Sequence, residues 1–255
     1  MLKIYILLLL IISQPVMGFV VLIDPGHGGT EYGATTKITK KNSKGKFYTR
    51  NIYEKDLTLQ LAKKLKKLIQ PRFSTYLTRS IDRTVSLEER AAMADTVKAD
   101  VFISIHFNSS ALKKSHGLET YYLDNHDDKA IKKVEEVENE SLEGDKKIIN
   151  QILIDLVIQK TVPSSKKLAT LIHEEVSQKI AKKMSIRDRG IKPGLFYVLA
   201  LSKRPGVLIE AGFVSNPKEA AQISSKKYLE EYAKSVAKGI IKYQNQLPKK
   251  DVPLF

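Results

Sequence analysis

Three short segments of this chain place a histidine or a glutamate at the end of a strand-like apolar run. The segments are residues 24–29, 104–108 and 209–213. They carry His27, His106 and Glu210, whose side chains can bind a metal ion or move a proton. Because ligands of open α/β sheets collect beyond the carboxyl ends of the strands, we expect the three side chains to share one site. The pattern predicts the centre of a metal-dependent hydrolase.

Two histidines and one carboxylate are sufficient ligands for catalytic zinc, which takes three protein ligands and keeps a fourth position for water. Glu54 is the candidate for the third ligand, although a carboxylate just before a lysine-rich helix also suits the positive end of the helix dipole. Zinc lowers the pKa of its water to about 7 and polarises a carbonyl group. We expect structural roles for the other histidines, which are His116, His126 and His173.

Glu210 comes directly after the apolar run 207–209, where an isolated buried charge would cost several kcal/mol, roughly. Such a carboxylate needs either an ion-pair partner or a chemical function. Beside a metal, a carboxylate can serve as a general base and acid, which takes a proton from the attacking water and delivers it to a leaving nitrogen. The alternative is a salt bridge to Arg189 or Arg187.

Six segments have the composition of strands, and helical patterns alternate with them. The expected strands are residues 19–23, 73–78, 101–105, 118–123, 195–199 and 206–209. The expected helices are residues 57–68, 86–98, 165–184 and 228–244, with one more helical turn after Pro217. Residues 35–53 are polar and lysine-rich, which predicts a long loop or a hairpin. The alternation predicts an α/β fold, with a mainly parallel twisted sheet of about six strands flanked by helices.

Residues 124–163 depart from this alternation. Its first part is dense in charge, and its second part is an amphipathic stretch of isoleucine, leucine and valine. Its acidic residues include Glu135, Glu136, Glu138, Glu140 and Glu143. We interpret it as an insertion with helices of its own.

The first eighteen residues have the pattern of a secretory signal peptide, with Lys3 before the apolar run 4–12 and small residues before a cleavage site after Gly18. The alternative is an uncleaved membrane anchor, but about 20 apolar residues are needed to span a bilayer. We therefore expect no stable membrane span after cleavage. Export to the periplasm is the favoured location, with secretion or association with the wall as alternatives. Residues 19–247 then form one domain, and residues 248–255 a frayed tail.

The chain has no cysteine and a formal net charge of +15. Any metal must therefore be held by histidine and carboxylate groups. A positive surface favours anionic partners. Nucleic acid is not favoured, because the lysines are spread along the chain without a recognisable binding module and with few aromatic residues. For an exported protein, anionic polymers of the cell envelope are the simpler partner.

Seven motifs, in order, resemble the zinc-dependent N-acetylmuramoyl-L-alanine amidases of the bacterial cell wall, from about Phe19 to Gln244. The motifs are the segments 23–29, 53–57, 77–79 with 82–83, 86–90, 104–109, 187–190 and 210–216. The resemblance implies that His27, Glu54 and His106 bind zinc and that Glu210 is catalytic. Structural roles are expected for Asn108, Arg189 and Asn216. Two departures are Ala211, where a larger aliphatic residue is common, and the long segment before Glu54.

The family resemblance implies hydrolysis of the amide that joins N-acetylmuramic acid to L-alanine in peptidoglycan. The insertion is similar to the regulatory insertion of members that separate daughter cells, in which a helix blocks the site until an activator protein displaces it. Glu138 is the first candidate for an inhibitory fourth zinc ligand and Glu140 the second; the alternative is a solvated acidic helix. Other functions left open are a different peptidoglycan zinc hydrolase, a peptidase or a deacetylase, and a non-catalytic wall-binding module with a structural zinc.

Overall fold

The computed structural model describes residues 18–41, 44–139 and 151–248. The expected signal peptide, apart from Gly18, lies outside the described residues, as do Glu140 and all but the first residue of the expected tail. Across the described ranges, no helix is both long enough and apolar enough to cross a membrane.

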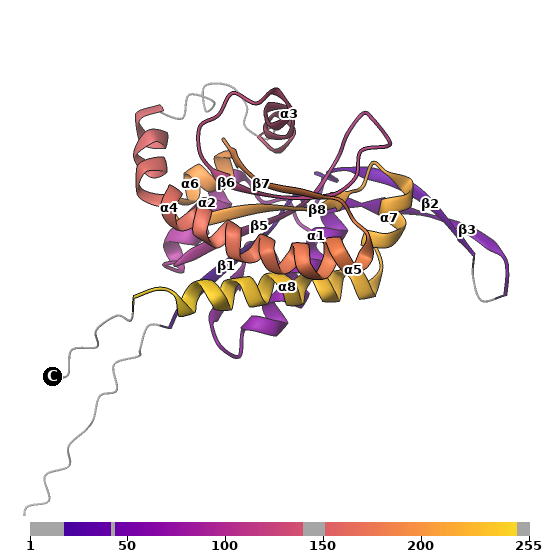
Figure 1. Ribbon diagram of the computed structural model, residues 1–255, viewed down its shortest axis with the longest axis horizontal. Coiled ribbons are helices and arrows are strands. Elements are labelled where there is room, and N and C mark those ends of the chain that lie inside the picture. The colour runs from indigo at the N-terminus through magenta and orange to yellow at the C-terminus, as the bar shows by residue number, and fades with distance from the viewer. Residues whose placement is uncertain (1–17, 42–43, 140–150, 249–255) are drawn as a thin grey trace, which may run out of the picture.

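Strands and helices alternate along the chain, as the sequence predicts (Figure 1). The strands are β1 (Val20–Pro25), β2 (Thr35–Lys41), β3 (Phe47–Tyr53), β4 (Ser74–Leu77), β5 (Val101–Asn108), β6 (Leu118–Leu123), β7 (Asp188–Gly194) and β8 (Gly206–Phe213). The helices are α1 (Glu54–Ile69), α2 (Leu87–Thr96), α3 (Lys129–Glu138), α4 (Gln151–Val176), the π-helical turn η2 (Ser177–Ala181), α5 (Lys182–Met184), α6 (Tyr197–Ser202), α7 (Pro217–Ile223) and α8 (Lys226–Asn245).

The main sheet has six strands in the order β4-β1-β5-β8-β6-β7. All neighbouring strands are parallel except β6 and β8, which are antiparallel. The predicted fold class, a mainly parallel α/β sheet of six strands, is therefore confirmed. Strands β2 and β3 pair as a separate antiparallel hairpin, which projects away from the body of the protein (Figure 1).

One predicted strand is wrong. Residues 195–199, expected as a strand, lead into helix α6, and the sixth strand is instead β7, which precedes them. A short apolar run does not distinguish a buried helix from a buried strand. The sequence of β7 is polar and includes Pro193. Proline is tolerated in an edge strand, and β7 lies at the edge of the sheet.

Helix α4 is longer than the sequence suggests. It runs through Pro163, so the expected end of the insertion lies inside a helix. From Gln151 on, the amphipathic stretch of the insertion and the expected helix 165–184 are one structural unit, continued by η2 and α5. Ile154 and Val157 of this unit are buried against the sheet, so its beginning contributes to the core.

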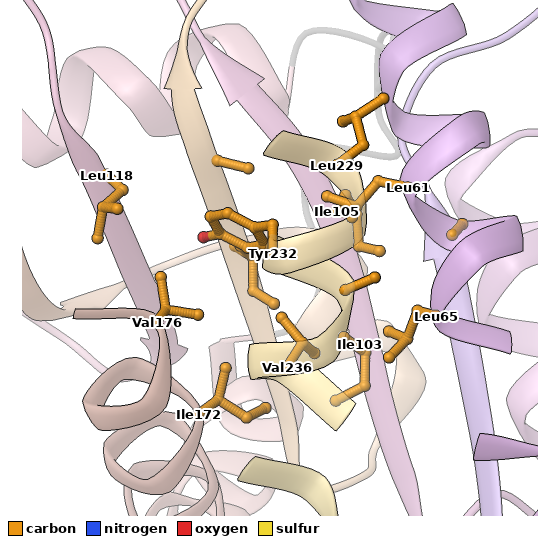
Figure 2. Packing of buried hydrophobic residues seen from close by; sticks show 14 of the residues in the cluster. Leu61, Leu65, Ile103, Ile105, Leu118, Ile172, Val176, Leu229, Tyr232 and Val236 are labelled. Atoms are coloured by element: carbon orange, nitrogen blue, oxygen red, sulfur yellow. The ribbon is translucent and has the colours of Figure 1, made fainter. Parts of the chain in front are cut away.

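The sheet separates two hydrophobic clusters, because successive side chains of a strand point to opposite faces. On one face, helices α1, α4 and α8 cover residues such as Ile103, Ile105 and Leu118 (Figure 2). On the other face, α2, α3 and α6 cover residues such as Leu22 and Phe102. Burial on both faces explains why β1, β5 and β8 have near-continuous apolar sequences.

The second face becomes polar toward the carboxyl ends of the strands. Along β1, Leu22 is followed on the same face by Asp24; along β8, Leu208 is followed by Glu210. In β5, Ser104 and His106 continue the face that begins with Phe102. The strands extend beyond the expected boundaries, so His106 and Glu210 are paired residues of the sheet rather than residues of the turns after it.

The crossing of α4 and α8 depends on a glycine. A Cβ atom at Gly239 would lie 2.4 Å from Ile172 Cα. We expect Gly239→Val to lower the free energy of unfolding by about 1–3 kcal/mol, because backbone atoms must move to admit the side chain. Thermal denaturation measures the effect. The exposed Lys227→Ala of the same helix is the control, and equal melting temperatures for the two variants would contradict the close contact.

Candidate active site

Four side chains with metal-binding atoms converge at the carboxyl end of the sheet. They are His27, Glu54, His106 and Glu138, and one ligand atom of each lies within 4.8 Å of all the others. Three of these residues are the predicted ligands, and the fourth is the residue predicted to block the site. They come from the loop after β1, the start of α1, strand β5 and the end of α3. The cluster could therefore hold a metal ion only in the folded protein.

His27 is held in a conformation that is uncommon for a residue with a side chain. Its φ angle is 57°, and the glycines after it also have positive φ angles, 133° at Gly28 and 59° at Gly29. Such strain persists only where the surrounding structure fixes it, and it concentrates at functional sites. Here the Arg90 guanidinium donates a hydrogen bond to the His27 carbonyl oxygen, at 3.0 Å.

Glu54 is the first residue of α1, so its carboxylate lies at the amino-terminal end of a helix, as the sequence predicts. Its side chain nevertheless points into the cluster. Glu54 Oε1 accepts a hydrogen bond from the Phe107 amide at 2.9 Å, and Oε2 accepts one from the Ala34 amide at 2.7 Å. Oε1 also lies 3.2 Å from His27 Nε2 and 3.3 Å from His106 Nδ1. A Cβ atom at Gly33 would come within 2.5 Å of Glu54 Oε2, so this turn needs a glycine.

The buried ligand atoms are close together without hydrogen-bonding one another. His106 Nδ1 lies 2.5 Å from Glu138 Oε2, and His27 Nε2 lies 3.7 Å from the same oxygen. None of these three atoms has a hydrogen-bond partner among the described residues. Convergence of unpartnered nitrogen and oxygen atoms on one point is what a bound cation would satisfy, and imidazole with carboxylate is a donor set that zinc accepts.

The charges of the cluster are strongly coupled. Burial alone would lower the pKa of His106, but Glu138 and Glu54 raise it well above its ordinary value. Burial likewise opposes the charge on Glu54, yet the charge of His27 and the close approach of both histidine rings lower its pKa. The pKa of His27 is raised, mainly by Glu54 against the effect of burial. The protein has thus gathered carboxylates around two imidazoles.

Glu210 lies on β8 opposite His106 of β5, and both are buried. Neither carboxylate oxygen has a hydrogen-bond partner in the described part of the chain. The alternative of a salt bridge to Arg189 is wrong, because that guanidinium binds Glu119. Burial first, and then the charge of Glu138, raise the pKa of Glu210 well above its ordinary value. A buried carboxyl group of raised pKa beside a metal-binding cluster suits proton transfer.

A cavity of 490 Å³ opens beside the cluster. Its lining includes His27, Glu54, His106 and Glu138, together with Leu208 on the same face of β8 as Glu210. Apolar residues such as Phe196 and Val198 form another part of its wall. The arrangement of a concave pocket with a few converging polar groups is typical of an active site.

Comparison with known proteins agrees with this geometry. Residues 21–242 match the N-acetylmuramoyl-L-alanine amidase family. The chain belongs to this family. The amidase LytC of Bacillus subtilis (strain 168) is 30% identical over 91% of this chain, and the match covers 37% of LytC.

Solved amidase structures share the fold. The N-acetylmuramoyl-L-alanine amidase of Clostridium difficile 630 superposes with a TM-score of 0.65 at 28% identity, covering 91% of this chain and 100% of that chain. The CwlD amidase of Clostridioides difficile, solved in complex with the GerS lipoprotein, gives a TM-score of 0.64 at 25% identity, covering 89% of this chain and 99% of that chain.

Two buried arginines hold the first histidine loop of this amidase family member. Arg90 pairs with Asp24 at 2.5 Å, and Arg79 donates hydrogen bonds to the carbonyl oxygens of Pro25 and Gly26, at 3.0 and 2.8 Å. The sequence motifs contain these residues, but their spacing gives no indication of this role. Contact with Arg90 lowers the pKa of Asp24 despite its burial, so the pair stays charged.

A second buried carboxylate, Glu119 of β6, lies opposite Glu210 in the sheet. Unlike Glu210 it is fully partnered: Arg189 and Lys192 bind Oε1, while Asn108 and Tyr121 donate to Oε2 at 2.9 and 2.7 Å. Asn108 and Arg189 therefore have the structural roles expected for them. Asn216 also does, because its side chain caps α7 and donates to the carbonyl oxygen of Ser115.

The other histidines have protein partners. His116 contacts the Lys114 carbonyl oxygen, His126 pairs with Glu135, and His173 bridges Thr120 and Asp188. Each therefore has the structural role that the sequence predicts.

The backbone at Gly26 lies close to the ring of His106. A Cβ atom there would lie 2.3 Å from the His106 ring. We expect Gly26→Ala to displace the ring and to weaken metal binding by about 10- to 100-fold. Isothermal titration with Zn²⁺ measures the affinity, and circular dichroism checks that the variant is folded. Unchanged affinity in the folded variant would show that His106 is not a ligand.

Proposed function

We propose that this protein is a zinc-dependent N-acetylmuramoyl-L-alanine amidase, which hydrolyses the amide between N-acetylmuramic acid and L-alanine in peptidoglycan. The observation that carries the proposal is the convergence of His27, Glu54 and His106 beside the unpartnered carboxyl group of Glu210. The family and its solved amidases support the choice of bond. An exported protein, periplasmic or otherwise located at the wall, would meet this substrate, and its positive charge suits an anionic polymer.

In this proposal His27, Glu54 and His106 hold the zinc ion within the domain of residues 19–247. Zinc supplies polarisation of the amide carbonyl and activation of water when it is bound. Glu54 is fixed by two backbone amides, so it orients both histidines as well as binding. The backbone of His27 is fixed by Arg90, which keeps the ligand set in place before metal arrives.

Glu210 moves the proton in this reaction. Amide hydrolysis needs a group that accepts a proton from water and gives one to the departing amine. Burial and the charge of Glu138 raise the pKa of Glu210, so its carboxyl group holds a proton more readily than an exposed glutamate does. Its two oxygens have no partner among the described residues, so neither is already committed to a structural bond.

Glu138 is the proposed inhibitory ligand, and helix α3 is the proposed gate. Its side chain is 6% exposed and lies against both histidines. Contacts at the end of α3 hold it there: Asn139 binds the Leu195 carbonyl oxygen and the Tyr197 amide, each at 2.9 Å. An activator protein that displaces α3 would open the site, in a role suited to septum splitting. The CwlD amidase was solved with a partner, the GerS lipoprotein.

Replacing the proton-transfer group tests the catalytic assignment. We expect Glu210→Gln to lower kcat by about 10²- to 10⁴-fold, with zinc content unchanged, because the amide cannot exchange the proton. Dye release from labelled peptidoglycan measures activity, and metal analysis measures zinc. Equal release by wild type and variant would exclude Glu210 as the catalytic group, whereas no release by the wild type would leave the wall-binding alternative. Mass analysis of the products separates an amidase from a peptidase or deacetylase, since only an amidase leaves free stem peptides and intact glycan.

Removing the blocking carboxylate tests the gate. We expect Glu138→Ala to raise activity on purified peptidoglycan several-fold, because it opens the metal centre without removing the buried residues that α4 contributes. Glu136→Ala is the matched control, since Glu136 is exposed on the same helix. If the two variants have equal activity at equal zinc content, α3 is a solvated acidic helix rather than an inhibitor.

A further inference from the structure

The β2–β3 hairpin is an exposed arm attached directly to the candidate active site. The cavity lining includes Gly33 and Ala34 immediately before β2, and Glu54 immediately after β3. Residues 35–53 contain five lysines and one arginine and no acidic residue. The arm, which projects away from the body of the protein (Figure 1), therefore carries a local excess of positive charge.

The two faces of the hairpin differ. Paired residues of an antiparallel ladder share a face, and successive pairs alternate between faces. On the inner face, Ile38 and Ile52 are buried, and Arg50 donates a hydrogen bond to Ser224 at the end of α7, at 3.0 Å. The part of this face formed by Ile38, Ile52 and Arg50 is therefore occupied by contacts with the body of the protein.

The outer face is exposed and combines three chemical types. Lys37 is paired with Asn51, and Lys41 with Phe47. Phe47 is 68% exposed, with the Lys41 ammonium 5.7 Å from the centre of its ring. An exposed aromatic ring among cations and an amide contributes little to a core and is accessible to a ligand.

The outer face begins beside the cavity. Tyr53, at the base of β3, packs against Tyr32 with 5.3 Å between ring centroids, and Tyr32 is 52% exposed. Tyr32 is adjacent in the chain to Glu31 and Gly33, which both line the cavity. Aromatic and polar groups therefore continue from the edge of the cavity to the far part of the arm.

We propose that the outer face of the hairpin binds the glycan strand of peptidoglycan while the site acts on one of its peptide substituents. This extends the proposed function, on which it rests, by naming where the polymer lies. Ring faces of sugars pack on Phe47 and Tyr32, Asn51 binds acetamido or hydroxyl groups, and the lysines attract the carboxylates of neighbouring stem peptides.

The length of the arm favours a polymer over a small ligand. Strands of seven residues extend the surface by roughly 20 Å. A single small molecule would contact only part of this strip, whereas a chain of sugars can lie along all of it. The charge is complementary to a polymer with carboxylates and is spread along the strip rather than gathered in one pocket.

Two adjacent aromatic residues provide a matched test. Phe47 is on the outer face, while Tyr48, 46% exposed, is on the inner face. In cosedimentation with insoluble peptidoglycan, we expect Phe47→Ala to weaken binding by about fivefold or more and Tyr48→Ala to change it by less than about twofold. Lys37→Gln should weaken binding in a salt-dependent manner. Circular dichroism verifies folding.

A kinetic readout separates this inference from the amidase assignment. We expect Phe47→Ala to raise KM for polymeric peptidoglycan with kcat unchanged, and to leave cleavage of a soluble monosaccharide-peptide unaffected. Equal binding by Phe47→Ala and Tyr48→Ala would overturn the glycan surface. The glycan surface would also be overturned if Phe47→Ala lost binding to phosphatidylglycerol vesicles but kept its binding to peptidoglycan. That result would assign the face to a lipid surface. If the wild type did not cleave the amide, only the proposed function would be overturned. Cosedimentation would still test whether the hairpin binds the polymer.

Discussion

The carboxylate of Glu54 connects the elements on which the site depends. It is buried, it begins α1, and its two oxygens bind amides from β5 and from the turn before β2. A buried carboxylate is costly unless donors or positive charges surround it. The same requirement brings both histidines to it, so satisfying one charge fixes a strand, a helix and a hairpin relative to one another.

Other buried carboxylates on one face of the sheet also need partners. Asp24, Glu119 and Glu210 are buried carboxylates at the polar ends of β1, β6 and β8. The first is balanced by Arg90, and the second by Arg189 and Lys192. Only the third has no hydrogen-bond partner among the described residues. Asp24 and Glu119 are thus paired within the sheet, whereas the carboxyl group of Glu210, to which the proposed reaction assigns proton transfer, has no such bond.

The sequence predicts those features that depend on local pattern. Alternating apolar runs predict the sheet, and residue type at the strand ends identifies His27, His106 and Glu210. It does not reveal β7, because an edge strand exposes one side and tolerates a polar sequence with proline. Nor does it indicate the partners of Glu119 or the role of Arg90, since these contacts join residues far apart in the chain. The turn glycines are visible as residues, but the atoms that exclude a Cβ belong to the folded state.

Glu138 links access to the site with the electrostatics inside it. Its carboxylate lies against His106 and, after burial, has the largest effect on the pKa of Glu210. Two carboxyl groups near one another resist simultaneous ionisation, so a negative charge on Glu138 favours the protonated form of Glu210. Movement of α3 would remove that charge together with the steric block, and the pKa of Glu210 would fall toward its ordinary value. In the proposed mechanism, the helix that carries this carboxylate into the cluster would control both the space for substrate and the protonation of Glu210.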